Sequence, residues 1–390
     1  MTITKVINDG QLIINMEGVL NSSNAQQASE KVENEPSAGV NSILIDIKKL
    51  DYISSAGLRI ILSLKKKAKA MPFKIINANN DVMKVFDDTG FSSIMDIEAA
   101  LRQVSIEGCK MIGHGACGEV YRLDDEQIIK LYYPHISDET IEQEKALAKK
   151  AFTLDIPTAI SFDIVECDGR KGVIYELIKS KTVTELIRDD LEHMDKYVRL
   201  YADTCKKIHS IDGSKSDLPK FKTQNREDIA RITDITEDEK ALLYRFIDLV
   251  PEGSTCIHGD LNPNNIMFSN GECCLIDMGE FSTGIKEWDI SRILFSLKYG
   301  NMFNDFNSFY KLSHDDVDKI LTLFLDEYYG MHDLEKISNL DDNSKFLMPL
   351  TWFRCICSMC KGDRWAPEFK NLGQELLHDH LIPFIKELDK

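Results

Sequence analysis

The sequence lacks several features that would assign the protein to particular classes. No run of about 18 consecutive apolar residues occurs, so the sequence predicts no transmembrane helix. The N-terminal residues, MTITKVINDG, do not contain the apolar segment of a secretory signal. Without export, the ten cysteines indicate reduced thiols rather than a disulfide framework. We therefore expect a cytoplasmic protein without a membrane partner.

Basic residues are also scarce relative to acidic ones. The 390 residues contain 47 Lys and Arg against 64 Asp and Glu, a formal net charge of −17. This balance disfavours nucleic acid and anionic membranes as partners, because both are themselves negative. Residues 1–103 hold 12 basic and 12 acidic residues, so the negative excess lies in the remainder. The length and this asymmetry predict two units, residues 1–103 and 104–390, joined near residues 98–108.

The first unit alternates strand and helix patterns. Apolar runs predict buried strands at Gln11–Val19, Asn41–Leu50 and Phe73–Asn79. An amphipathic helix is predicted at Ser54–Ala70, and another begins near Asp81 and stops at Gly90. This order is typical of a small α/β domain with βαβ crossovers.

The second unit begins with strand patterns and continues with helical ones. Strands are predicted at MIGHGACGEVYRL, at QIIKLYY and at Gly172–Ile178, and a helix at Ser137–Phe152. From about Ser180 the pattern is mostly helical. We expect a bilobal α+β domain, with a β-rich N-lobe over residues 107–178 and a mainly helical C-lobe over residues 179–390.

A glycine-rich segment lies in the first of these strand patterns. Gly113, Gly115 and Gly118 form the pattern GxGxxGxV. Glycines let a strand–turn–strand close over phosphates, because no Cβ blocks the backbone amides. On its own the pattern also fits a tight hairpin that binds nothing.

A lysine follows in the next strand. Lys130 ends an apolar run, from which a lysine can reach the α- and β-phosphates of a nucleotide. We expect Glu144, on the following helix, to be its partner, with Glu142 and Glu139 as alternatives. For each of these side chains a solvated surface position is the simpler interpretation.

Two further segments carry acidic and amide side chains. His258–Asn265 reads HGDLNPNN, in which Asp260 would take the proton of an acceptor hydroxyl and Asn265 would bind Mg²⁺. In the apolar segment LIDMG, Asp277 is placed to hold Mg²⁺ against the phosphates. Either segment alone could be a polar turn, but their conjunction favours the metal-binding interpretation.

These four segments together resemble the aminoglycoside phosphotransferase and choline kinase superfamily over about residues 109–300. The resemblance implies a kinase-like fold and Mg²⁺-dependent phosphoryl transfer from ATP, with GTP as an alternative donor. It further implies that backbone groups near Glu176 and Ile178 read the adenine. Asp289, in the segment WDI, is implied to brace the catalytic loop.

The segment that follows Asp277 indicates the class of acceptor. Only MGEFSTGIKEW separates Asp277 from Asp289, too little for the segment on which protein kinases dock a peptide. We therefore expect a small-molecule acceptor with a hydroxyl group. The acidic composition suits a cationic acceptor, and it equally suits a solvated acidic surface.

Residues 46–59, DIKKLDYISSAGLR, closely resemble the signature of STAS domains, the anti-sigma factor antagonist modules of bacteria. The resemblance covers about residues 1–100. It implies phosphorylation by a partner kinase at Ser55, or next at Ser54, which breaks contact with an anti-sigma factor or another protein. A helix N-terminus tolerates a phosphate, although both serines also suit simple helix capping.

Two functions are therefore considered. The first is an ATP- and Mg²⁺-dependent phosphotransferase that acts on a small-molecule hydroxyl and is coupled to a STAS regulatory domain. The second is an antagonist-type regulatory protein whose kinase-like unit senses nucleotide or another ligand. A hybrid, in which the second unit phosphorylates Ser54 or Ser55, is disfavoured by the short segment after Asp277.

Several other side chains are set aside. Cys355, Cys357 and Cys360 lack a fourth ligand nearby and fit buried helix positions better than a metal site. Cys117, inside the glycine-rich segment, is a candidate reactive thiol. His209 fits a helix residue better than a catalyst.

Overall fold

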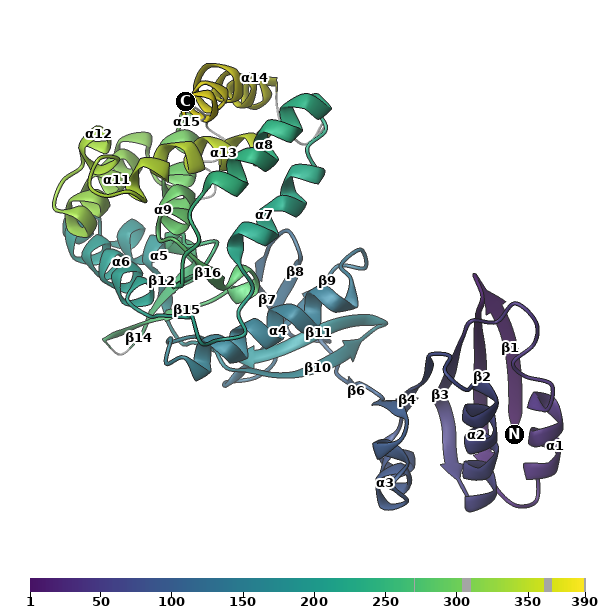
Figure 1. Ribbon diagram of the computed structural model, residues 1–390. Helices are drawn as coiled ribbons and strands as arrows, with labels where there is room; N and C mark the ends of the chain where they lie inside the picture. Colours follow the sequence, from purple (N-terminus) through teal and green to yellow (C-terminus); the bar gives the residue numbers. More distant parts are fainter. Residues whose placement is uncertain (270, 304–309, 361–366, 389–390) are drawn as a thin grey trace. The chain divides into compact units, whose positions relative to one another are not determined.

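The computed structural model describes residues 1–269, 271–303, 310–360 and 367–388 (Figure 1). The chain divides into two compact units, residues 1–104 and 105–390. Among the described helices, none combines the length and apolar character needed to cross a bilayer.

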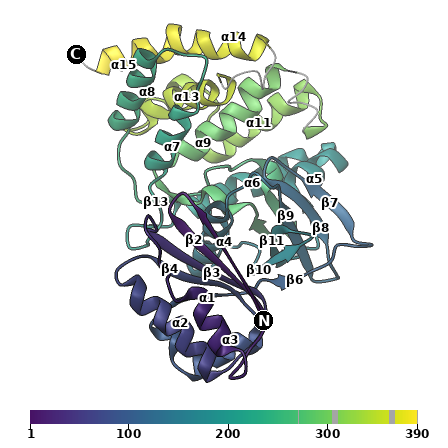
Figure 2. The ribbon, with the colours of Figure 1, turned by 90° about the vertical axis from the view of Figure 1, so that its right-hand side faces the viewer.

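The first unit is built on a five-stranded sheet with the order β1-β2-β3-β4-β5. Its elements are β1 (Thr2–Asn8), β2 (Gln11–Leu20), α1 (Ala25–Val32), β3 (Ser42–Ile53), α2 (Ser55–Ala68), β4 (Phe73–Ala78), α3 (Asn80–Asp88) and β5 (Asp96–Ala99). The pair β1–β2 is antiparallel, and the pairs from β2 to β5 are parallel. The helices gather on one side of the sheet (Figure 2), so this unit has the predicted α/β class with βαβ crossovers.

One core fills the space between this sheet and its helices. Leu12, Ile45 and Ile75 are fully buried there. The strand predicted to end at Leu50 continues as β3 to Ile53, because its residues pair with β2 as far as Leu20. The sequence patterns missed β1, since only Ile3 of this strand is buried.

The second unit begins with an antiparallel sheet in which the strands run β10-β11-β9-β8-β7. Its elements are β7 (Lys110–His114), β8 (Gly118–Arg122), β9 (Gln127–Tyr132), α4 (Asp138–Thr153), β10 (Ser161–Cys167) and β11 (Arg170–Glu176). The strand predicted at Gly172–Ile178 ends earlier, at Glu176, because its partner β9 begins at Gln127, opposite Glu176. This part is the predicted β-rich N-lobe.

The C-lobe is mainly helical, as predicted (Figure 1). Its helices are α5 (Val183–Asp189), α6 (Met194–His209), α7 (Phe221–Ala230), α8 (Glu237–Leu249), α9 (Glu287–Leu294), α11 (His314–Tyr329), α12 (Leu334–Ile337), α13 (Leu347–Met359), α14 (Pro367–Glu375) and α15 (Ile382–Leu388). Its short strands are β12 (Lys181–Thr182), β13 (Thr255–Ile257), β14 (Ile266–Ser269), β15 (Glu272–Leu275) and β16 (Ser282–Gly284). The loop between β13 and β14 contains the HGDLNPNN segment. The LIDMG segment begins at the end of β15.

Candidate active site

The glycine-rich segment forms the turn of the β7–β8 hairpin. Gly115 N–H donates to Gly118 O at 2.9 Å, which closes the turn. A Cβ at Gly118 would lie 2.4 Å from Leu131 O of β9, so the close approach of these two strands requires glycine there. A Cβ at Gly115 would meet no described atom within 4 Å, so packing does not explain that glycine, and Gly113 is similarly unobstructed.

Lys130 of β9 joins the two lobes of this unit. Its Nζ lies 2.6 Å from Glu144 Oε1 of α4 and 3.1 Å from Asp277 Oδ1, just beyond β15. The side chains of Lys130 and Glu144 are 17% and 8% exposed. Burial alone would lower the pKa of Lys130, but Asp277 and Glu144 outweigh it and raise that pKa, so the lysine is charged. Tyr175 O–H also donates to Glu144 Oε1, at 3.3 Å.

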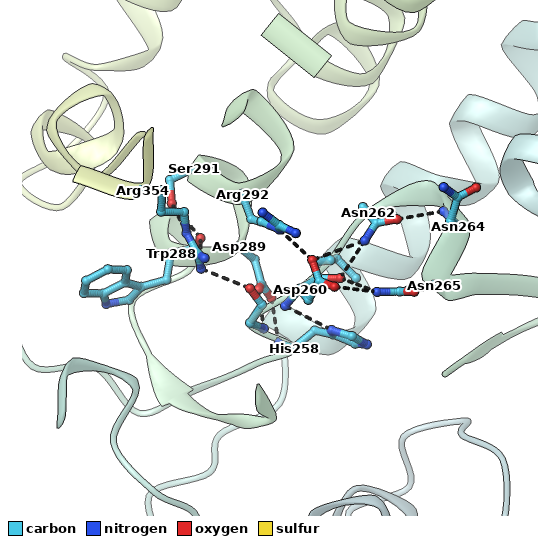
Figure 3. Close-up of polar contacts among 12 residues, drawn as sticks. His258, Asp260, Asn262, Asn264, Asn265, Trp288, Asp289, Ser291, Arg292 and Arg354 are labelled. Atoms are coloured by element: carbon cyan, nitrogen blue, oxygen red, sulfur yellow. Dashed lines mark hydrogen bonds and ion pairs between the residues drawn. The ribbon is translucent and has the colours of Figure 1, made fainter. Parts of the chain in front are cut away.

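Asp260 lies in the loop after β13, where three side chains bind its carboxylate (Figure 3). Asn265 Nδ2 donates to Oδ2 at 3.0 Å and Asn262 Nδ2 to Oδ1 at 3.2 Å. Arg292 Nε, from α9, donates to Oδ1 at 2.5 Å. Burial would raise the pKa of Asp260, but the charge and hydrogen bond of Arg292 lower it overall. The carboxylate is therefore ionised and can accept a proton from a nearby hydroxyl.

Asp289 of α9 is fully buried and holds the backbone of this loop (Figure 3). Its Oδ2 accepts from His258 N at 2.8 Å, and its Oδ1 accepts from Gly259 N at 2.7 Å. His209 Nε2 lies 3.1 Å from the same Oδ2, and His209 Nδ1 lies 2.7 Å from Tyr328 OH. His209 is the last residue of α6, in agreement with the expected helix position. Its buried ring also connects Asp289 to Tyr328 of α11.

His258 ties the loop to the strand that precedes Asp277. Asp260 N–H donates to His258 Nδ1 at 3.3 Å, and His258 Nε2 lies 3.0 Å from Ile276 O. Both contacts are satisfied when Nδ1 accepts and Nε2 donates. Gly259, which follows, has φ +86°, and a Cβ there would lie 2.4 Å from Glu280 Cβ. A side chain at this position is therefore excluded by both backbone conformation and space.

Asn265 and Asp277 occupy neighbouring strand ends. Ile276 N–H donates to Asn265 O at 3.0 Å, which places Asn265 beside the residue preceding Asp277. Asn265 Nδ2 donates to Asp260, which leaves the amide oxygen as a possible ligand. The Asp277 side chain is 49% exposed, and its φ of +61° is uncommon for a residue other than glycine. An amide oxygen and a carboxylate are hard oxygen ligands, so these residues fit Mg²⁺ completed by phosphates and water.

The sequence patterns assigned no role to two arginines of this site, Arg292 and Arg354. Arg292 lies three residues after Asp289, on the same side of α9. This spacing could have been used to predict that Arg292 lies near the site. Arg354 of α13 donates through Nη2 to Gly259 O at 3.0 Å and Trp288 O at 3.2 Å, and through Nε to Ser291 Oγ at 3.0 Å. Its 95-residue separation from Gly259 gives no local signal.

The segment after β11 connects the two lobes. Leu177 N–H donates to Glu126 O at 2.7 Å, and Ser180 N–H donates to Ile178 O at 2.9 Å. Glu176 N–H donates to Ile160 O at 2.9 Å. Among the described residues, no backbone carbonyl accepts from Ile178 N–H.

The cysteines lie in less reactive surroundings. Burial raises the pKa of the Cys117 thiol, which favours its protonated form over a reactive thiolate. Cys355, Cys357 and Cys360 are buried in or directly after α13. Within the described part of the chain, no group of three or more His, Cys, Asp or Glu side chains is placed to hold a metal ion.

In the first unit, the two serines occupy different positions at the start of α2. Ser54 is the N-cap, and its Oγ accepts from Gly57 N at 3.5 Å. Ser55 is the first helical residue, and it is exposed. Capping therefore explains Ser54 but does not explain Ser55.

Comparisons with known proteins address both units. The STAS domain model matches residues 2–104, and the phosphotransferase enzyme family (APH) model matches residues 108–311. A Bordetella bronchiseptica protein named anti-sigma factor antagonist BtrV is 34% identical over 99 residues, which are 25% of this chain and 84% of that protein.

Solved structures similar to this chain include kinases of small molecules. The ADP-bound aminoglycoside phosphotransferase APH(2'')-Ib has a TM-score of 0.46 and 18% identity, over 71% of this chain and 94% of its own. A choline/ethanolamine kinase family protein of Mesorhizobium loti has a TM-score of 0.42 and 11% identity, over 72% of this chain and 87% of its own.

The fold and the family matches define a small α/β module followed by a kinase-like domain. The chain belongs to the phosphotransferase enzyme family, and residues 2–104 form a STAS domain.

Proposed function

We propose that the second unit, residues 104–390, transfers the γ-phosphoryl group of ATP to a hydroxyl of a small molecule, and that the STAS domain regulates this activity. The observation that carries the proposal is the double contact of Lys130. This lysine binds Glu144 and Asp277 at 2.6 and 3.1 Å, and so joins the glycine-rich sheet to the strand that carries the metal-ligand candidate. The related structures include an ADP-bound phosphotransferase, which supports a nucleotide as donor.

The nucleotide would lie between the lobes. The turn at Gly113, Gly115 and Gly118 would cover the phosphates. One of the three Lys130 donors would bind them, while the other two stay with Glu144 and Asp277. The Ile178 N–H and a backbone group of Glu176 would read the adenine, with GTP as an alternative donor. Asn265 and Asp277 would hold Mg²⁺, which when bound neutralises charge that develops on the phosphates.

Asp260 would act on the acceptor. The hydroxyl donates a hydrogen bond to the ionised carboxylate, which takes the proton as the new O–P bond forms. The bond between the γ-phosphorus and the β-phosphate oxygen breaks, and the products are a phosphate ester and ADP. Asp289 fixes the loop backbone through two hydrogen bonds of 2.8 and 2.7 Å, so the base is positioned before the acceptor arrives.

The packing between Asp277 and Asp289 supports a small acceptor. Phe281, Ser282 and Thr283 are buried, and β16 pairs with β13 in this interval. The interval is therefore part of the core and offers no free segment on which a peptide would dock.

An assay with γ-labelled ATP and Mg²⁺ tests the proposal. The whole chain is incubated alone and with a pool of small alcohols, and the label is located by mass analysis. We expect label on a small molecule with the wild type, and loss of Mg²⁺-dependent nucleotide binding in Asp277→Ala. Unchanged Mg²⁺–ATP affinity in Asp277→Ala would contradict the assignment of this residue.

A second candidate function is supported by the exposed position of Ser55. In this alternative the protein is an antagonist-type regulator whose STAS domain binds an anti-sigma factor or another protein, and whose second unit senses nucleotide or a ligand. Phosphorylation of Ser55, which adds charge at the start of α2, would break that contact. Label on Ser55 or Ser54 in the same assay would support the hybrid in which the second unit is itself the kinase.

A partner-binding measurement tests the regulatory function directly. Ser55→Asp should weaken binding of the full chain to a protein partner, whereas Ser55→Ala should not. Equal binding by both variants would argue that Ser55 has no switching role.

A further inference from the structure

Arg292 lies directly beside Asp260, the proposed base. Its Nε lies 2.5 Å from Asp260 Oδ1, and both side chains are 26% exposed. The guanidinium lies over the Phe295 ring, 5.1 Å from its centroid, which fixes its plane. In Figure 3 Arg292 approaches Asp260 from the α9 side, while Asn262 and Asn265 approach from the loop. Both side chains thus belong to one partly open charged surface.

The geometry of the base limits where the acceptor lies. Asn262 and Arg292 bind Oδ1 of Asp260, and Asn265 binds Oδ2. A hydroxyl that reaches this carboxylate comes within a few ångströms of the guanidinium. Since Nε–H is directed at Asp260, the two Nη groups of Arg292 remain as donors toward the rest of the acceptor.

The charges that neighbour Arg292 are of both signs. Arg354 donates to three neutral oxygens among the described residues, and burial lowers its pKa, so this cation is only partly compensated. Glu280 and Asp289 are the other nearby carboxyl groups. Burial and then Asp260 raise the pKa of Glu280, whereas burial of Asp289 is outweighed by the hydrogen bond with His209, and the pKa of Asp289 is lowered. Arg292 therefore lies beside Asp260 and Glu280, and Arg354 lies beside Glu280 and Asp289.

From this arrangement we infer that the acceptor is an alcohol that also carries a carboxylate or phosphate group, and that Arg292 binds this anion. The inference rests on the proposed function and names the substrate class of that site. A guanidinium matches two oxygens of a carboxylate or phosphate at once, whereas an ammonium group at the same place is repelled.

Acceptors matched in everything except charge provide the test. We would compare hydroxy acids with their primary amides, for example 4-hydroxybutanoate with 4-hydroxybutanamide, and measure kcat/KM for each. The wild type should prefer the acid by about ten- to a hundredfold, the range for a charge-assisted hydrogen bond. Arg292→Gln should bring this ratio close to one, and Arg292→Lys should keep part of it. Arg231→Gln, at a 66% exposed arginine, is the control and should keep the wild-type ratio.

The ratio of kcat/KM for acid and amide distinguishes binding of the acceptor's anion by Arg292 from orientation of Asp260 by Arg292. If Arg292 only orients Asp260, Arg292→Gln lowers kcat for acid and amide alike and leaves their ratio unchanged, which would overturn the inference. A wild-type preference for the amide or for amino alcohols would overturn it as well.

Failure of the proposed function gives a different result. If no acceptor is phosphorylated, the proposed function fails, and calorimetric binding of the same pair to the protein with Mg²⁺ and ADP decides the inference. Tighter binding of the acid, lost in Arg292→Gln, would support the anion site. Equal binding of acid and amide would overturn it.

Discussion

The STAS domain and the phosphotransferase unit differ in how deeply they bury their ion pairs. In the first unit the sheet core is apolar, the ion pair Lys49–Glu17 has side chains 73% and 44% exposed, and the pair Lys5–Glu35 has side chains 36% and 8% exposed. In the second unit the pair His209–Asp289 has side chains 4% and 0% exposed. Buried charges rarely add net stability, because desolvation offsets their attraction. The second unit thus buries a charged carboxylate beside the loop that carries Asp260, whereas the first unit keeps Lys49 and Glu17 at its surface.

The largest expected effect comes from the most buried of these charges. Asp289→Ala leaves the N–H groups of His258 and Gly259 without their acceptor and His209 without its carboxylate. We expect the second unit to lose roughly 3–5 kcal/mol of its free energy of unfolding. All three tryptophans lie after residue 104, so tryptophan fluorescence during urea unfolding follows this unit alone.

A matched control for this variant is Asp203→Ala, since Asp203 is 60% exposed in a surface ion pair. It should change the free energy of unfolding by less than about 0.5 kcal/mol. A similarly small change in Asp289→Ala would contradict the bracing role.

The next effect is a dependence of stability on pH that is confined to the second unit. Glu287 of α9 is fully buried, neither of its carboxyl oxygens has a hydrogen-bond partner among the described residues, and burial raises its pKa to about 7. Since the folded protein binds this proton more tightly than the unfolded chain, stability falls as pH rises from about 4.5 to about 7. Glu287→Gln should therefore stabilise the unit at pH 8 by roughly 3 kcal/mol, and by little near pH 4.5.

Urea unfolding at a series of pH values measures this difference. Glu237→Gln is the control, because Glu237 is 87% exposed. Parallel stability curves for wild type and Glu287→Gln would show that Glu287 is not the titrating group.

The smallest effect separates the two serines of the first unit. Ser54→Ala removes the N-cap of α2 and should destabilise the STAS domain by about 1 kcal/mol. Ser55→Ala removes an exposed hydroxyl and should change stability by less than about 0.5 kcal/mol. Calorimetric unfolding of both variants measures this, and equal losses would mean that both serines act in capping.

Local patterns predicted most of the fold but not all of it. Apolar segments predicted β2, β3 and β4 within a few residues, because every second side chain along most of these strands is buried. The strand β1 lacked this signal, since six of its seven residues are exposed. The strand β11 was shifted, because its end depends on where the partner β9 begins.

The residues of the candidate site were also predicted only where a local sequence pattern indicated them. Motifs indicated Lys130, Asp260, Asp277 and Asp289, since each lies in a short segment of recognisable chemistry. Arg292 lies at a spacing from Asp289 that could have been used. Arg354 reaches Gly259 only through the packing of α13, which no local pattern encodes.

Transfer of labelled phosphate by wild type and Asp260→Ala, with nucleotide affinity measured in parallel, is the most direct test of the second unit as a phosphotransferase. We expect the wild type to label a small hydroxyl compound, and Asp260→Ala to bind Mg²⁺–ATP with nearly unchanged affinity while its transfer rate falls roughly 10²–10⁴-fold. Transfer by Asp260→Ala at a rate close to that of the wild type would contradict the role of Asp260 as the base.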